Sequence, residues 1–202
     1  MSWEFSDLWN EVLSMVDTCE REGVKPKLHP QGFIQLDLSG DRSKRLHIWE
    51  PSIPRTAATD TMHNHVWKFK STVLCGTLFD IKVEPKRNLA GNWEVWQAKP
   101  DRHVGGRGGK ILQKTGARCA VDEEKIARIR AGETYSFRAF DFHDSVAVGY
   151  TATLFQKGTD YGGDPLVICK RGQRPDNELP SEATPEFMWS IINRLREVNN
   201  GS

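Results

Sequence analysis

Apolar residues recur with a helical period near both ends of the chain. Over residues 5–21 the pattern predicts an amphipathic helix carried by Leu8, Trp9, Val12, Leu13 and Val16. Over residues 185–198 a second such helix is carried by Phe187, Met188, Ile191, Ile192 and Leu195. Ser6 suits the first N-cap, Gly23 suits its end, and Pro185 stands early in the second helix. We expect both helices to lie on the outside of a core.

Between the helices the pattern changes to short stretches of alternating apolar and polar residues. Glycine, proline, aspartate and asparagine separate them, which is typical of an all-β barrel or sandwich. The predicted strands cover residues 32–38, 45–49, 62–75, 77–83, 92–98, 111–114, 119–121, 135–137, 145–148 and 151–157. The first two form a predicted hairpin, and residues 123–130 fit either a helical turn or a strand. Residues 158–184 show no clear period.

One predicted strand carries two histidines that suit metal binding. Side chains alternate faces along a strand, so His63 and His65 are expected to point the same way. Two imidazoles on one face can hold a transition metal if a third ligand arrives from elsewhere in the chain. His143, which follows the predicted strand near Tyr135, is our candidate for that third ligand.

The bulk properties narrow the classes of function. The 202 residues predict one domain, and 28 basic against 27 acidic residues give no reason to expect a nucleic-acid or membrane-surface binder. No apolar run approaches a membrane span, and the start of the chain lacks the basic residues of a secretory signal, so we expect a cytoplasmic protein. Four widely spaced cysteines without a CxxC pair predict free, buried thiols.

The histidine spacing resembles that of the cupin superfamily of small β-barrels (jelly rolls). The family's first motif has the form G-x5-H-x-H-x3-4-E-x6-G, and its second has the form G-x5-P-x-G-x2-H-x3-N. Here His63 and His65 followed by Gly76 match the first spacing, while Gly132 followed by His143 matches the second. The resemblance covers roughly residues 33–157 and implies a cupin-like barrel with flanking helices.

The departures from the motifs are specific. Phe69 stands in place of the glutamate ligand, and Ala57 in place of the opening glycine. In the second motif Arg138, Phe140 and Ala147 replace the proline, the second glycine and the asparagine. A three-histidine cupin is similar to thiol dioxygenases such as cysteine dioxygenase, and this resemblance implies Fe(II), a thiolate substrate and O2. No cysteine stands near Lys70 to form the cysteine–tyrosine crosslink of that enzyme.

The residues themselves support a less specific interpretation. Three neutral imidazoles leave a divalent ion its full charge and open positions, which suits an anionic ligand or a Lewis-acid role. Zn, Mn or Ni satisfy the same ligand set. Around the ion, Arg45 could neutralise a substrate carboxylate or phosphate, with Arg55 as an alternative. His47 could act as an acid–base residue and Tyr135 could contact the substrate, while Asp144 or Ser145 could orient an imidazole.

The predicted organisation is therefore a single cupin-like domain over residues 1–202. A helix (about 5–21) precedes the barrel (about 32–157), and a C-terminal extension with a helix (about 158–199) follows it. The leading functional hypothesis is an Fe(II) dioxygenase acting on a small, anionic molecule. The alternatives are a non-catalytic ligand-binding protein and a metal-dependent isomerase or hydrolase. A homodimer stays open, and the Gly-rich stretch 105–110 is expected to be a surface loop.

Overall fold

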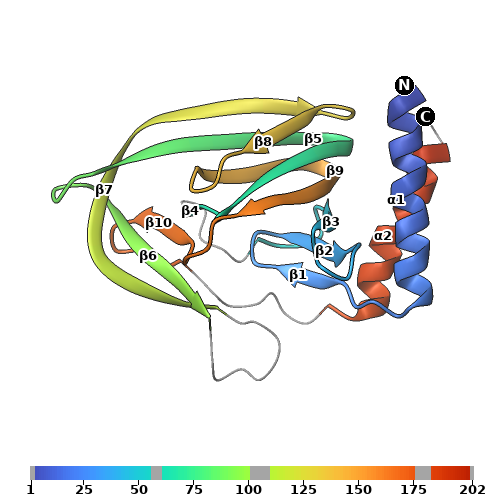
Figure 1. Ribbon diagram of the computed structural model, residues 1–202, viewed down its shortest axis with the longest axis horizontal. Helices are drawn as coiled ribbons and strands as arrows, with labels where there is room; N and C mark the ends of the chain where they lie inside the picture. The colour runs from blue at the N-terminus through green and yellow to red at the C-terminus, as the bar shows by residue number, and fades with distance from the viewer. Residues whose placement is uncertain (1–2, 56–60, 101–109, 176–182, 201–202) are drawn as a thin grey trace.

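The computed structural model describes residues 3–55, 61–100, 110–175 and 183–200 (Figure 1). Strands make up most of it, and the two helices lie at the ends of the chain. In chain order the elements are α1 (Trp3–Arg21), β1 (Lys27–His29), β2 (Phe33–Asp37), β3 (Lys44–Trp49), β4 (Thr61–His63), β5 (Trp67–Arg87), β6 (Trp93–Pro100), β7 (Lys110–Arg130), β8 (Thr134–Phe137), β9 (Phe142–Asp160), β10 (Leu166–Lys170) and α2 (Pro185–Asn200).

Both helices form where their apolar spacing predicts them, but α1 begins at Trp3, so Ser6 lies inside the helix and the N-cap prediction is wrong. The α1 helix ends at a glycine in the left-handed region, Gly23 with φ 69°, and the Val24 amide donates to the Cys19 carbonyl at 2.9 Å. At the start of α2, Thr184 Oγ1 accepts a hydrogen bond from the Phe187 amide at 3.2 Å, as an N-cap does. The helices pack side by side against one end of the sheet (Figure 1). Neither has the combination of length and apolar character that crossing a membrane demands.

Several predicted short strands turn out to be parts of long ones. The prediction that a strand ends at Gly76 is wrong, because β5 continues through this residue. Gly76 has φ 78°, and the pairing with β9 slips there by a register shift. A Cβ at this position would lie 2.5 Å from the Tyr150 carbonyl oxygen, so only glycine lets the two strands approach.

Other parts of the strand prediction also change. Residues 123–130 belong to β7, which resolves the choice between helix and strand. The predicted strands at 145–148 and 151–157 are one strand, β9, and β1 and β10 were not predicted. β10 lies within the stretch that shows no period in the sequence. β10 pairs with β4 on one side and with β6 on the other, and these distant neighbours set its register. A local sequence pattern does not reveal them.

The strands pair antiparallel and the sheet closes on itself. Hydrogen-bonded neighbours can be followed from β9 to β4, β10, β6, β7, β5 and back to β9. The link between β4 and β9 consists of a single residue pair, His63 opposite His143. The all-β fold with flanking helices is confirmed. The sequence-predicted hairpin is also confirmed, as β2 and β3.

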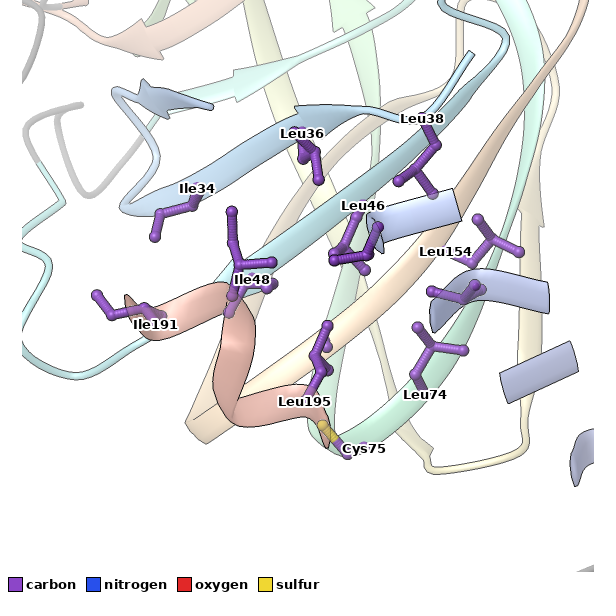
Figure 2. Close-up of a cluster of buried hydrophobic side chains, with 14 of the residues drawn as sticks. Ile34, Leu36, Leu38, Leu46, Ile48, Leu74, Cys75, Leu154, Ile191 and Leu195 are labelled. Atoms are coloured by element: carbon purple, nitrogen blue, oxygen red, sulfur yellow. The ribbon is translucent and has the colours of Figure 1, made fainter. Parts of the chain in front are cut away.

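The layer formed by β3 and β9 presents two different faces. On β3, Leu46 and Ile48 face the helices, and they pair with Leu154 and Ala152 of β9. Figure 2 shows this aliphatic face against Ile191 and Leu195 of α2. The alternate residues, Arg45, His47 and Trp49, lie on the inner face of the closed sheet. All four cysteines are free and buried, as predicted.

Candidate metal centre

Three histidines from separate segments meet on the inner face of the closed sheet. His63 is the last residue of β4 and stands directly opposite His143 of β9, and paired residues of antiparallel strands share a face. His65 lies in the short connection to β5. The ring centroids of His63 and His143 are 4.6 Å apart, and that of His65 lies 4.8 Å from His63 and 5.2 Å from His143. One ligand nitrogen from each ring lies within 4.8 Å of the others.

The backbone that presents these rings differs from the prediction. We expected His63 and His65 to alternate along one strand, but β4 stops at His63 and β5 starts at Trp67. The buried Asn64 between them explains the break. The side-chain Oδ1 of Asn64 accepts a hydrogen bond from the Leu166 backbone N–H at 2.7 Å. The backbone N–H of Asn64 donates to the Leu166 carbonyl at 3.0 Å. Asn64 therefore fastens the connection to β10, a role that the sequence pattern does not indicate.

The electrostatics of His143 suit a ligand. The residue is 5 % exposed, and neither ring nitrogen has a hydrogen-bond partner among the described residues. Burial, helped by the nearby His63 and Lys82, holds the pKa of His143 well below its ordinary value. The ring is therefore neutral at pH 7 and keeps a lone pair. A buried imidazole with two unsatisfied nitrogens is costly unless something binds there, so the donor set fits a metal ion.

Aromatic rings surround the histidines. Phe137 lies 4.2 Å from His143 between ring centroids, Phe69 lies 5.4 Å from it, and Trp67 stacks on His65 at 5.0 Å. Phe69 thus places a hydrocarbon wall beside His65 and His143. Such a wall limits the access of water and lowers the local dielectric, which strengthens any charge interaction inside.

A series of polar side chains, Gln31, Asp144 and Arg55, contacts the histidine cluster through His63. The Gln31 side-chain amide lies 3.0 Å from His63 Nδ1 and 3.5 Å from Asp144 Oδ1. Asp144 in turn forms an ion pair with Arg55, with Nη1 and Oδ2 2.8 Å apart. Burial raises the pKa of Asp144, and Arg55 opposes this shift. Sequence reasoning named Asp144 and Arg55 but missed Gln31, whose position depends on a turn far away in the chain.

Tyr135 lies one aromatic ring away from the cluster. Its ring is 6.4 Å from Phe69 and 6.0 Å from Phe137, both of which contact His143. Burial raises the pKa of Tyr135 to about 12, and the nearby hydroxyls of Ser71 and Ser145 oppose only part of this shift. The phenol is therefore protonated at pH 7 and can donate a hydrogen bond.

Arg45 and His47 lie farther from the cluster, next to Phe155. The Arg45 Nε donates to the Arg42 carbonyl at 3.2 Å and lies 3.7 Å from Asp37 Oδ1. Burial lowers the pKa of His47 well below its ordinary value, and its ring packs at 5.2 Å from Phe155. The Gly-rich loop predicted at 105–110 falls mostly outside the described residues.

Comparison with known proteins adds little to this geometry. No protein-family model matches the chain, and no curated protein matches it in sequence. Among solved structures, the chain is similar to hydroquinone 1,2-dioxygenase from Sphingomonas sp. TTNP3 with 4-hydroxybenzoate bound, with a TM-score of 0.30 and 12% identity. That match covers 61% of this chain and 64% of the other, less than two thirds of its length. A likeness this weak carries no argument about function.

The fold and the site together describe an all-β protein with a candidate metal site. The chain is a closed antiparallel sheet with two terminal helices, and its inner face carries a three-histidine group able to hold a metal ion.

Proposed function

We propose that the protein is a metal-dependent enzyme of the cupin type, in which His63, His65 and His143 hold one divalent metal ion. The observation that carries this proposal is the state of His143. It is buried, neutral at pH 7 and unpartnered at both nitrogens among the described residues, and its ligand atom lies within 4.8 Å of those of two other histidines. Histidine clusters of this kind are the usual donors to Zn, Fe and Ni in proteins.

For the chemistry, we propose Fe(II) and a dioxygenase reaction on a small, anionic molecule, resembling that of thiol dioxygenases. When bound, Fe(II) supplies the one-electron chemistry that reactions with O2 require. Three neutral ligands support this choice, because they leave the ion its full charge for an anionic substrate and for a second small molecule. Zn, Mn and Ni satisfy the same donors, and Zn, which has no redox chemistry, leads instead to hydrolysis or isomerisation.

The chain's own residues take three roles in this proposal. Phe69 and Phe137 exclude water from the imidazoles, which favours a substrate with an apolar part beside them. Tyr135 is protonated at pH 7, so it donates a hydrogen bond to the substrate rather than accepting its proton. Gln31 fixes the orientation of the His63 ring when its side-chain oxygen accepts from Nδ1–H, which leaves the lone pair of His63 Nε2 for the metal.

Metal analysis of the purified protein tests the site. We expect about one transition metal ion per chain, lost from the His143→Ala and His63→Ala variants. His29→Asn is the matched control, because His29 stacks on Phe33 with ring centroids 4.3 Å apart outside the cluster, and asparagine keeps an acceptor for the Gln31 backbone amide. Metal that persists in His143→Ala, or is absent from the wild type under all loading conditions, would contradict the proposed site.

Oxygen consumption tests the reaction. The iron-loaded protein should consume O2 with at least one member of a panel of small thiols and other anionic substrates, and His63→Ala should not. A stoichiometric metal without O2 consumption would favour the hydrolase or isomerase alternative. Saturable ligand binding without turnover would favour a non-catalytic binding protein.

A further inference from the structure

The side chains behind His63 impose a condition on metal binding that the three histidines alone do not reveal. The side-chain nitrogen of Gln31, Nε2, lies 3.0 Å from His63 Nδ1 and 3.5 Å from Asp144 Oδ1. One end of the Gln31 amide therefore faces an imidazole nitrogen and a carboxylate oxygen at the same time. The end that stands there decides on which nitrogen His63 carries its proton.

Asp144 is held as a hydrogen-bond acceptor on both of its oxygens. Its Oδ2 lies 2.8 Å from Arg55 Nη1 in a buried ion pair, and its Oδ1 accepts a hydrogen bond from the Ser145 backbone N–H at 2.8 Å. A carboxylate in such an ion pair only accepts hydrogen bonds. Gln31 must therefore offer a donor to Oδ1, and it does so with its nitrogen.

This orientation of Gln31 places the His63 proton on the wrong nitrogen for a metal ligand. A neutral imidazole has one N–H and one lone pair. When the Gln31 nitrogen donates to Nδ1, the proton of His63 lies on Nε2, the nitrogen that would bind the ion. Before the ion binds, the proton has to move to Nδ1, and Gln31 has to turn its amide so that Oε1 accepts from Nδ1–H.

Asp144 opposes this turn of the Gln31 amide. After the turn, the amide oxygen faces Asp144 Oδ1 where the amide nitrogen faces it now. A hydrogen bond to a charged acceptor is lost, and two acceptors meet in its place. Because Asp144 is buried, water screens their repulsion poorly. The carboxylate therefore favours the amide orientation that belongs to the metal-free site.

We propose that Asp144 is a positioning residue that regulates the metal centre. Through the Gln31 amide it favours the tautomer of His63 that cannot bind the ion, and it thereby lowers the metal affinity. This inference rests on the proposed function in assigning His63 to the metal. Its sign is distinctive, because a negative charge near a cation ordinarily strengthens cation binding. Arg55 suits this role, because its ion pair holds Asp144 in place and balances that charge.

The tautomer of His63 tests the proposal in the wild-type protein without metal. Proton–nitrogen correlation nuclear magnetic resonance spectra of the full chain, with isotope-labelled histidines and after chelator treatment at pH 8, distinguish the two tautomers. The signals of His63 are those that disappear in His63→Ala. We expect the proton on Nε2 and Nδ1 as the acceptor. A metal-free His63 with its proton on Nδ1 overturns the proposal.

The zinc affinity of Asp144→Asn is the second test. Asparagine keeps the size of the side chain and removes its charge, so the preference for an amide nitrogen at Gln31 weakens whichever end of the asparagine faces it. Competition with a coloured chelator should show zinc binding about threefold more tightly than in the wild type. The His63 proton should also shift toward Nδ1. Unchanged or weaker zinc binding overturns the proposal.

Two further variants separate the amide from a general effect of charge. Asp141→Asn removes a carboxylate two positions before His143, and Oδ2 of Asp141 accepts from the Arg138 backbone N–H. This variant should bind zinc no more tightly than the wild type. In a Gln31→Met background the gain from Asp144→Asn should vanish, as a double-mutant cycle measures. A gain in Asp141→Asn, or one that persists without Gln31, overturns the role of the amide.

The metal centre and the role of Asp144 can fail separately. If the protein binds no metal, the proposed function fails, while the tautomer of His63 and its response to Asp144→Asn are still measured. If metal binds through the three histidines but metal-free His63 carries its proton on Nδ1, the proposed function stands and the regulatory role of Asp144 fails.

Discussion

The two faces of the β3–β9 layer are built from the same strands but from different chemistry. The helix-facing side is aliphatic, with Leu46, Ile48 and Leu154 buried against α1 and α2 (Figure 2). The inner side carries aromatic rings, hydroxyls and imidazoles, several of them with buried polar atoms that lack partners among the described residues. Alternation along a strand separates them, because neighbouring residues point to opposite faces.

The two faces differ in what they contribute: the aliphatic face contributes to stability, and the inner face contributes to binding. Shortening a side chain on the aliphatic face lowers the free energy of unfolding, because packing and burial are the interactions that the face supplies. The inner face instead contains groups whose burial is unfavourable until a ligand arrives, such as His143. Shortening a side chain on the first face should therefore lower the free energy of unfolding, whereas substitutions on the second should change metal binding or remove the cost of a buried charge.

The largest expected effect comes from a cavity on the helix-facing side. Leu46 is fully buried, and Leu46→Ala should lower the free energy of unfolding by about 2–5 kcal/mol. Urea unfolding followed by circular dichroism measures this loss. Metal content per folded chain should stay at the wild-type value, and a parallel loss of metal would show that the two faces are coupled.

A smaller effect of opposite sign is expected on the inner face at Asp80. This residue is 2 % exposed, and burial raises its pKa to about 6. A raised carboxyl pKa means that stability falls as the pH rises from about 4 to about 6, because the folded state must then bury the charge. Asp80→Asn should therefore stabilise the protein at pH 8 by at most about 3 kcal/mol, with the gain vanishing below pH 4.

Unfolding at pH 8, 6 and 4 checks the Asp80 prediction. The control is Glu84→Gln, which changes an exposed carboxyl on the same strand and should stay within about 0.5 kcal/mol of the wild type throughout. A gain for Asp80→Asn that is the same at every pH would point to packing instead of charge.

Metal should stabilise the protein through the inner face alone. At a free metal concentration 100 times its Kd, the free energy of unfolding should rise by about 2.7 kcal/mol. His143→Ala should abolish the increment, and Leu46→Ala should retain it, because distant substitutions usually add independently. Thermal unfolding with and without metal measures both variants. An unchanged increment in His143→Ala would remove this residue from the ligand set.

The smallest effect is expected outside both faces, at the ion pairs between the helices. Arg196 of α2 binds Asp17 and Glu20 of α1, but its side chain is 35% exposed and screened by solvent. Arg196→Gln should lower the free energy of unfolding by no more than about 1 kcal/mol, and added salt should reduce the difference further. A larger loss that persists in high salt would mean that the helices depend on this contact as much as on the aliphatic face.

Much of the fold was predictable because its signals are local. The helical period of Trp9, Val12 and Val16 predicts α1, and the alternation around Leu46 predicts both β3 and its two faces. Strand length was not predictable, since Gly76 was expected to end a strand that continues through it. A glycine can end a strand or bend one, and the choice depends on the strand that packs beside it.

Some residues of the candidate site could also be predicted from the sequence, and others could not. The histidine spacing brought His63, His65 and His143 forward, and the structure places them together. Gln31 and Asn64 could not be predicted, because each acts through a contact with a residue far away in the chain. The roles of Arg45, His47 and Tyr135 stay predictions.

By itself the sequence determined the all-β class, the terminal helices and the free cysteines, while the resemblance to the cupin motifs supported grouping His143 with His63 and His65. These features follow from periodicity and residue chemistry, which act over a few neighbouring positions. Only the tertiary structure decided how the sheet closes, that His63 stands opposite His143, and that Arg55 pairs with Asp144. These features depend on pairing between distant strands, and the free energy of such pairing depends on the whole set of neighbours rather than on any local pattern.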